Sequence, residues 1–362
     1  MLMRGGTSRG PFFLESDLPS EPAARNRVLL AAMGSPDNRQ IDGLGGAHPL
    51  TSKVGIVRLS TKPGIQLDFQ FAQLQPNSDS VDYTANCGNM LAAVLPFALE
   101  SNLLPCEKGE TTARILTLNT GMQCDVTVQT PHGQINYAGN TQIDGVSGTA
   151  SPIRISFLDT AGSICPSLLP TGQPRDRVSV NDGIESPFSI DVTLIDNGMP
   201  MVLIRAMDFG LSGYELVEEL NGNLPMRAKL EALRLQVGPL MGLGDVTTKN
   251  YPKMCLVAPA GEGGNISTRC FIPHVCHEAI GVLAAVTIAT ACVMKGSITE
   301  GIATVRDELK QTLSIEHPTG EISVELELDS QDRQQVTGAA LIRTARLIMR
   351  GEVMIPKEIL QG

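Results

Sequence analysis

Apolar residues recur along this chain with two periods, one typical of helices and one typical of strands. Their spacing predicts helices over residues 25–33, 88–99, 225–241 and 277–294. Pro96 is expected to kink or break the second of these helices. Alternation and turn signals predict strands over residues 50–59, 114–118, 125–129, 134–137, 252–258, 311–316 and 322–328. The mixture of both element types indicates an α/β (α+β) protein.

The order of these elements repeats. Four short segments recur in the same order about 190–200 residues apart, which is the signature of an internal repeat. The matched pairs are residues 10–14 with 199–203, 53–57 with 253–257, 87–94 with 276–283, and 120–121 with 319–320. The alternative is chance similarity between ordinary strand and helix patterns.

The repeat predicts two similar halves, residues 1–180 and 181–362, with the last strand able to return to the first half. The joint is expected in the Pro/Gly/Asp-rich stretch 170–187. Two similar halves that face each other form a cleft, a common place for a ligand. The repeat then puts Cys87 and Cys276 on opposite walls of this cleft.

The length and net charge of the chain limit the kinds of partner that it can bind. The length of 362 residues suits two domains, and the net charge is −10 without blocks of Lys or Arg. This argues against nucleic acid as the main partner. An anionic ligand must therefore be held by local dipoles and a few Arg or Lys. The most apolar run, residues 279–294, is shorter than the roughly 20 residues of a membrane span, so we predict no membrane contact.

The eight cysteines do not form a tight Cys-x-x-Cys pair, and several lie in apolar stretches where Cys acts as a small hydrophobic residue. The chain opens directly into a glycine turn rather than into a signal peptide. We therefore expect reduced thiols and a cytoplasmic protein.

The segment Asn86-Cys87-Gly88-Asn89 precedes a predicted helix, with Asn86 as its N-cap. Unpaired N–H groups at a helix start bind carboxylates, and the same field lowers the pKa of a thiol. One local arrangement thus offers an anion site and an activated cysteine. The alternative is a buried cysteine at a tight turn.

The repeat provides a counterpart in Pro273-His274-Val275-Cys276-His277. Its two histidines either contact the substrate or simply cap and pack. Lys53 is a lysine in an otherwise apolar strand, and its repeat mate is Lys253. Burial would lower the pKa of Lys53, as a general base requires. The alternative is a lysine at a strand edge that reaches solvent.

Three glycine-rich loops, at residues 3–10, 42–46 and 196–200, allow the backbone to approach a ligand closely, unless they are plain turns. None has the pattern of a P-loop or a dinucleotide-binding turn. The sequence also lacks a zinc-type His-Glu-x-x-His and a Gly-x-Ser-x-Gly elbow, so we predict no metal site.

Six motifs together resemble the PrpF family, and they extend over nearly the whole chain: Met-Arg-Gly-Gly-Thr-Ser (3–8), Ile-Asp-Gly-Leu-Gly-Gly (41–46), Leu-Thr-Ser-Lys (50–53), Asn-Cys-Gly-Asn (86–89), Ile-Asp-Asn-Gly-Met-Pro (195–200) and Phe-Ile-Pro-His (271–274). The resemblance implies two pseudo-symmetric, diaminopimelate epimerase-like domains, each a curled mixed sheet around a central helix. It is strongest to 4-oxalomesaconate tautomerases and isomerases of aromatic catabolism.

The resemblance also implies a cofactor-independent isomerase in which Lys53 and Cys87 are the acid/base pair. Lys53 would remove a proton from a small unsaturated tricarboxylic acid, and Cys87 would return one elsewhere. The candidate substrate-binding residues are Arg4, Thr7, Ser8, Ser52, Asn86, Gly88, Asn89, Met199, His274, Cys276 and His277.

Several alternatives stay open. The substrate could be 2-methylaconitate or 3-methylitaconate rather than 4-oxalomesaconate, and the reaction either tautomerisation or double-bond migration. A racemase or epimerase would need Cys87 and Cys276 as a matched pair. A non-enzymatic accessory protein of an aconitase-like enzyme would show no turnover. The oligomeric state, with a homodimer as one option, also stays open.

Overall fold

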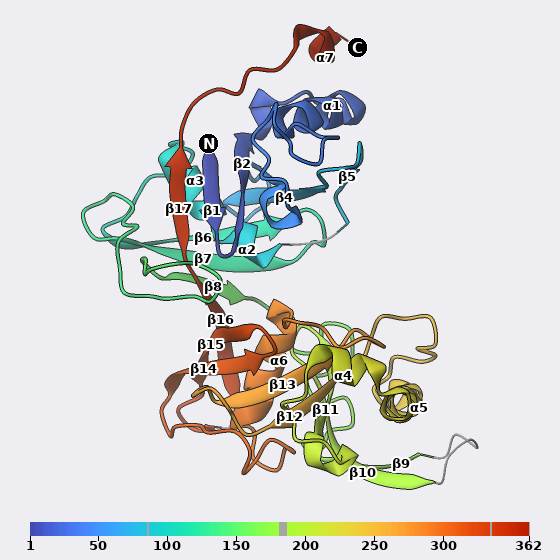
Figure 1. The fold of residues 1–362 in the computed structure, drawn as a ribbon. Helices are drawn as coiled ribbons and strands as arrows, with labels where there is room; N and C mark the ends of the chain where they lie inside the picture. The colour runs from blue at the N-terminus through green and yellow to red at the C-terminus, as the bar shows by residue number, and fades with distance from the viewer. Residues whose placement is uncertain (85–86, 181–186, 334, 362) are drawn as a thin grey trace. The chain divides into compact units, whose positions relative to one another are not determined.

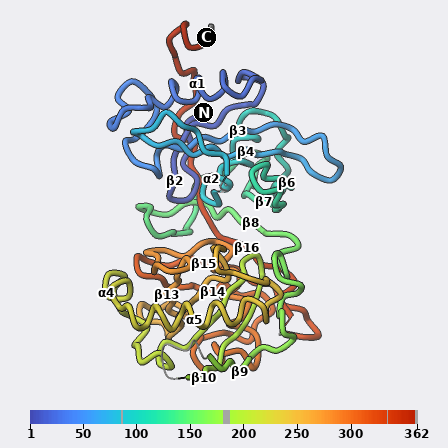
Figure 2. Tube along the Cα trace, turned by 90° about the vertical axis from the view of Figure 1, so that its right-hand side faces the viewer, coloured from blue at the N-terminus to red at the C-terminus, as the bar shows by residue number. Residues whose placement is uncertain are grey.

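The computed structural model describes residues 1–84, 87–180, 187–333 and 335–361, and the chain divides into two compact units (Figure 1). Unit 1 is Met1–Leu158 with Ile342–Gly362, and unit 2 is Asp159–Leu341. The division thus falls before the stretch 170–187 in which we expected the joint. The C-terminal segment belongs to unit 1, and Figure 2 shows its red trace running among the blue segments of that unit.

Unit 1 has one mixed sheet in the order β17-β1-β2-β3-β4-β6-β7-β8, with the short β5 beside β4. Its strands are β1 Leu2–Gly5, β2 Ser8–Leu14, β3 Lys53–Leu59, β4 Leu67–Leu74, β5 Val81–Asp82, β6 Gly109–Thr117, β7 Gln123–Thr130, β8 Ile153–Phe157 and β17 Ala345–Met349. Its helices are α1 Pro22–Met33, α2 Gly88–Leu91, α3 Val94–Glu100 and α7 Lys357–Gln361, with short 3-10 turns η1 Glu15–Asp17 and η2 Pro49–Thr51.

Unit 2 has its own mixed sheet, in the order β9-β10-β11-β12-β13-β14-β15-β16. Its strands are β9 Asp176–Val180, β10 Phe188–Asp196, β11 Pro200–Arg205, β12 Lys253–Ala258, β13 Ile266–Phe271, β14 Lys310–His317, β15 Gly320–Leu328 and β16 Val336–Arg343. Its helices are α4 Val217–Gly222, α5 Leu224–Leu240 and α6 Val282–Val293, with η3 Ala206–Phe209.

The two sheets share one pairing pattern. In unit 1 the neighbouring strands β1-β2-β3-β4-β6-β7-β8 pair antiparallel, parallel, antiparallel, parallel, antiparallel and antiparallel. In unit 2 the neighbouring strands from β10 to β16 pair in the same succession of directions. Lys53 opens β3 and Lys253 opens the equivalent β12. Two of the four matched pairs lie in equivalent strands and a third at the equivalent turns, so the predicted internal repeat is confirmed, as is the mixed α/β fold of two similar halves.

Each sheet packs on a central helical segment. In unit 1, α2 contacts β1 and β2, while α3 contacts β3, β7 and β17. In unit 2, α6 contacts β10, β11, β14 and β15, and it is mostly apolar and buried from Ala284 to Cys292. The amphipathic α5 packs its apolar side with Val202 and Ile204 of β11, while the alternate Met201 and Leu203 are also fully buried. This sheet is therefore covered on both faces.

Three predicted elements need correction. The helix predicted over 88–99 is divided into α2 and α3, because Pro96 has no N–H to donate to the Ala92 carbonyl and its ring would crowd that carbonyl. The helix predicted over 277–294 begins only at Val282. The strand predicted over 134–137 is absent, because the side chain of Asn136 bonds to both backbone groups of Ala138 and forms a turn.

Candidate active site

The turn between β1 and β2 carries the first glycine-rich motif. Gly5 pairs with Ser8, so Gly6 and Thr7 form a two-residue hairpin loop. A Cβ added to Gly5 would lie 2.3 Å from the carbonyl oxygen of Asn89, and one added to Gly6 would lie 2.1 Å from Asn89 Oδ1. The close approach predicted for a ligand is therefore made here by Asn89, at the start of α2.

Lys53 is buried at the first position of β3, with 8% of its surface exposed. Its Nζ donates to Oε1 of Gln73, the residue directly opposite on β4, at 2.5 Å, and lies 5.1 Å from the ring centroid of Phe71. Within the described part of the chain, no carboxylate pairs with this ammonium group. The predicted burial is confirmed, and the alternative of a lysine at a strand edge that reaches solvent is wrong.

Gln73 fixes the acceptor that Lys53 uses. Its Nε2 lies within hydrogen-bonding distance of the carbonyl oxygens of Pro49, Ser52 and Leu74, at 3.1, 3.3 and 2.8 Å. Gln73 was not a sequence-based candidate, because only the register of β3 against β4 brings it to Lys53.

Cys87 is the N-cap residue of α2. Its backbone is extended, and its carbonyl accepts the N–H of Leu91 at 2.9 Å. The thiol is free and half-buried. The predicted place of Cys87 directly before a helix is confirmed, and Gly88 and Asn89 form the first turn, where N–H groups have no intrahelical partner. Asn86, the predicted N-cap, lies outside the described residues.

Asn89 links the hairpin to a residue at the far end of the chain. Its Nδ2 donates to Thr7 Oγ1 at 2.9 Å, while its Oδ1 accepts from Nε of Arg343 at 3.2 Å. Burial lowers the pKa of Arg343 to about 10, and the nearby Cys87 partly offsets this by favouring the charge. The sequence analysis missed Arg343, because no local motif surrounds it and it is 254 positions from Asn89.

Arg4 is engaged within unit 1. Its Nη1 donates to the carbonyl oxygen of Gly6 at 2.8 Å and to the carbonyl and hydroxyl oxygens of Thr344 at 3.1 and 3.0 Å. Burial, and then the neighbouring charge of Arg346, lower the pKa of Arg4. These bonds tie the β1–β2 turn to the start of β17.

The two candidate serines differ in what their hydroxyl groups contact. Ser52 Oγ is fully buried and lies 2.9 Å from both Gln40 Oε1 and the His48 carbonyl oxygen. Ser8 Oγ is also buried, but no described group bonds to it. Ser8 faces the start of α2, because it is directly opposite Gly5, whose missing Cβ would point at Asn89. Ser8 is therefore the one of the two candidate serines whose hydroxyl no described group bonds.

In unit 2, Cys276 does not begin a helix. It forms a bridge to Phe271, and its N–H donates to Asn221 Oδ1 at 2.7 Å, so the chain folds back on β13 before α6 starts. The thiol is 2% exposed, and burial raises its pKa to about 12, with Cys270 adding to the effect. Cys276 therefore does not share the environment of Cys87, because its loop supplies neither a helix start nor exposure.

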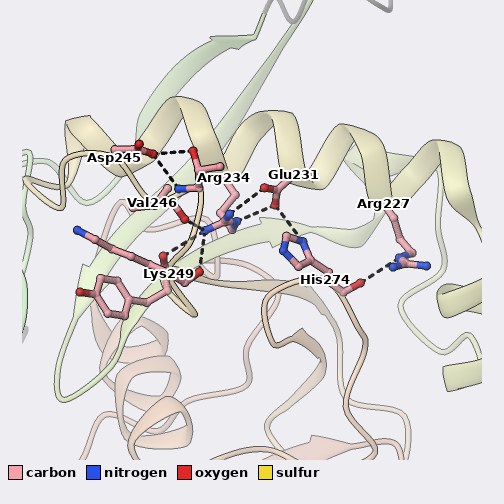
Figure 3. Close-up of polar contacts among 9 residues, drawn as sticks. Arg227, Glu231, Arg234, Asp245, Val246, Lys249 and His274 are labelled. Atoms are coloured by element: carbon pink, nitrogen blue, oxygen red, sulfur yellow. Dashed lines mark hydrogen bonds and ion pairs between the residues drawn. The ribbon is translucent and has the colours of Figure 1, made fainter.

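The candidate His274 is bound to α5 instead of facing Cys276. Its Nδ1 lies 3.2 Å from Oε2 of Glu231, which also accepts from the fully buried Arg234, and Arg227 Nε donates to the His274 carbonyl oxygen at 2.9 Å (Figure 3). These contacts fasten the loop that carries His274 and Cys276 to the helix.

His277 and Met199 complete the candidates of unit 2. The exposed imidazole of His277 contacts the backbone of Ala279 through Nδ1, at 3.0 Å from its oxygen and 3.2 Å from its nitrogen. The carbonyl of Met199 accepts from Thr287 Oγ1 of α6 at 3.2 Å. The structure thus brings Lys53, Thr7, Ser8, Cys87, Gly88 and Asn89 together in unit 1, and His274, Cys276 and His277 into one loop of unit 2.

The described residues contain no cluster of three or more His, Cys, Asp or Glu side chains arranged to hold a metal ion. A search of the same residues finds no helix long and apolar enough to cross a membrane.

Comparison with known proteins places this arrangement in context. A family model described as PrpF protein matches residues 1–356. The chain is 52% identical to the (4E)-oxalomesaconate Delta-isomerase of Novosphingobium sp., covering 98% of this chain and 96% of that protein. It is 49% identical to the 4-oxalomesaconate tautomerase of Pseudomonas putida, covering 100% and 97%. The crystal structure of a methylitaconate-delta-isomerase superposes with a TM-score of 0.86 at 34% identity, covering 100% and 96%.

Proposed function

Because this chain belongs to the PrpF family, we propose that it is an isomerase that moves a proton within a small unsaturated tricarboxylic acid, with 4-oxalomesaconate as the first candidate substrate. Two relatives at about half identity over their full length are named for that acid. The predicted enzyme class agrees with the names of both relatives.

One observation about the site carries the proposal: a buried lysine and a half-buried thiol lie in the same unit on neighbouring elements. Gly10 lies next to both elements, since a Cβ added there would lie 1.7 Å from the Lys53 carbonyl oxygen and 3.3 Å from the methyl group of Met90, three residues after Cys87. A buried amine without a carboxylate partner among the described residues and a thiol directly before a helix can serve as the base and the acid of a proton transfer between carbon atoms.

The reaction follows from these groups. A carbon next to a conjugated carbonyl or carboxylate carries an acidic proton, which the amine of Lys53 removes. The electron pair delocalises over the conjugated system, and the thiol of Cys87 donates a proton to its far end. Lys53 is then an ammonium and Cys87 a thiolate, and exchange with water restores both. The free N–H groups at the start of α2 stabilise the anionic intermediate.

Each proton comes from a side chain, so the proposed mechanism uses no metal and no organic cofactor. The eight cysteines are all free, which suits the reducing cytoplasm in which we place the reaction. The reading as a two-cysteine racemase loses support, because the Cys276 thiol is buried and its pKa is raised to about 12.

Proton NMR in deuterium oxide tests the proposal. The purified protein is incubated separately with 4-oxalomesaconate, 2-methylaconitate and 3-methylitaconate. We expect deuterium at one carbon of 4-oxalomesaconate, and loss of about 10²–10⁴-fold in rate for Lys53→Met, the range for a general base. A folded protein that exchanges no proton in any of the three acids would refute the proposal and favour the accessory role.

A further inference from the structure

The proposed substrate carries several negative charges, whereas the chain itself has a net charge of −10. A site near Cys87 therefore needs a local cation that is free to bind a carboxylate. Arg4, the candidate from the sequence, bonds through Nη1 to the Gly6 and Thr344 oxygens, whereas Arg343 bonds to Asn89, two positions after Cys87.

Arg343 lies at the end of β16, where the chain returns to unit 1. Its Nε donates to Asn89 Oδ1 at 3.2 Å, and its Nη1 donates to the Ile342 carbonyl oxygen at 2.9 Å. Among the described residues, Nη2 has no hydrogen-bond partner and no carboxylate pairs with the guanidinium. A half-buried guanidinium with one unused edge can donate charge-assisted hydrogen bonds to an anion.

The orientation of Arg343 is fixed by the residues that follow Cys87. Asn89 holds the guanidinium through Oδ1, and Thr7 holds the amide of Asn89 through its hydroxyl. The bond to Asn89, two positions after Cys87, places the guanidinium at the first turn of α2. With a pKa of about 10, lowered by burial, the guanidinium remains charged at neutral pH.

A second donor points to the same place. The buried Ser8 hydroxyl has no described partner and faces the start of α2 from the neighbouring hairpin. A guanidinium edge and a hydroxyl are both hydrogen-bond donors that suit the oxygen atoms of a carboxylate.

We propose that Arg343 binds one carboxylate of the substrate beside Cys87 and so makes the enzyme select acids that carry a carboxylate at this position. This inference rests on the proposed function, because it concerns the substrate of the same site. It assigns the recognition of the anion to the returning C-terminal strand.

Binding of two inert acids separates this inference from turnover. Propane-1,2,3-tricarboxylate and propane-1,3-dicarboxylate differ by one carboxylate, and calorimetry measures their Kd on the wild-type protein and on Arg343→Gln. We expect the wild type to prefer the tricarboxylate by roughly 10- to 100-fold, the range for a charge-assisted hydrogen bond. Arg343→Gln should lose most of this preference.

Two variants control the comparison. Arg346→Gln removes an exposed arginine three positions further along and should keep the preference. Arg343→Lys keeps the positive charge and should retain part of the preference for the tricarboxylate. If Arg343 had only a structural role, variants with unchanged thermal stability would all keep the full preference.

The outcomes separate clearly. If Arg343→Gln keeps the wild-type preference, or if the wild type shows none, the inference is overturned even when the protein isomerises 4-oxalomesaconate. If the preference depends on Arg343 but no acid exchanges deuterium, the carboxylate site stands and the proposed isomerisation fails.

Discussion

Replacing Gly10 by alanine should damage both the stability and the activity of this protein. An alanine Cβ at this position would lie 1.7 Å from the Lys53 carbonyl oxygen, whereas real Cβ contacts essentially never fall below 3.0 Å. The neighbouring group is backbone and cannot rotate away. The strands β2 and β3 must therefore separate by at least about 1.3 Å, the difference between these two distances, at the residue that carries the proposed base.

The magnitude follows from that displacement. Overpacking of a close-packed interior costs about 3 kcal/mol, which corresponds to a fall in Tm of about 6–12 °C for a unit of this size. A displacement of about 1 Å at a reacting group also lowers turnover by about 100-fold. Both effects should appear together, because one backbone contact causes them.

Thermal unfolding and the deuterium-exchange assay, run well below the Tm of the variant, measure the two effects. Gly222→Ala is the matched control, because a Cβ added there meets nothing within 4 Å. That change in α4 should be neutral or stabilise by up to about 1 kcal/mol. A Gly10→Ala protein with the wild-type Tm and turnover would show that β2 and β3 do not approach as the structure has them.

Three further predictions test other parts of the reasoning. Gln73→Met should lower kcat by about 10- to 100-fold with little change in KM, because Lys53 loses its fixed acceptor; steady-state kinetics with an unchanged kcat would contradict this. Cys276→Ser should keep turnover within about threefold of the wild-type rate in the exchange assay, since the Cys276 thiol is buried. A large loss of turnover would instead support a two-cysteine mechanism. Burial raises the pKa of Cys292 to about 12. The folded state therefore keeps this proton above pH 9 while the unfolded state releases it, so stability falls as pH rises from about 9 to 12, by up to about 1.4 kcal/mol per pH unit for this thiol. Urea unfolding across that window should give a flatter pH dependence for Cys292→Ala than for the wild type, and equal slopes would refute the assignment.

Local patterns were sufficient for one part of the site. Lys53 was identifiable because a lysine is unusual in an otherwise apolar strand, and the structure shows that its side chain is buried. Cys87 was identifiable because the residues after it have the spacing of a helix, and α2 begins at Gly88. The internal repeat was also visible, since both halves use the same succession of strand and helix patterns.

The contacts that the sequence did not predict have a common cause. A local motif indicates what a residue can do, but a partner far away in the sequence decides which contact it makes. Cys276 matches Cys87 in the repeat. Its N–H, however, donates to Asn221 Oδ1 and the chain folds back on Phe271, so no helix starts there. Arg4 stands in a motif that suggests ligand binding, and its Nη1 also bonds to Thr344 of the returning chain, a contact that the motif does not indicate. Neither partner is close in sequence.

The sequence by itself therefore determined the repeat, the mixed α/β class, the buried lysine and the cysteine before a helix, because each depends on periodicity within about ten residues. Only the tertiary structure decided that Gln73 meets Lys53, that Asn89 holds Arg343, and that the Cys276 thiol is buried. Strand register and the return of the last strand set these contacts. They join residues up to 254 positions apart, over which a hydrophobic pattern carries no information.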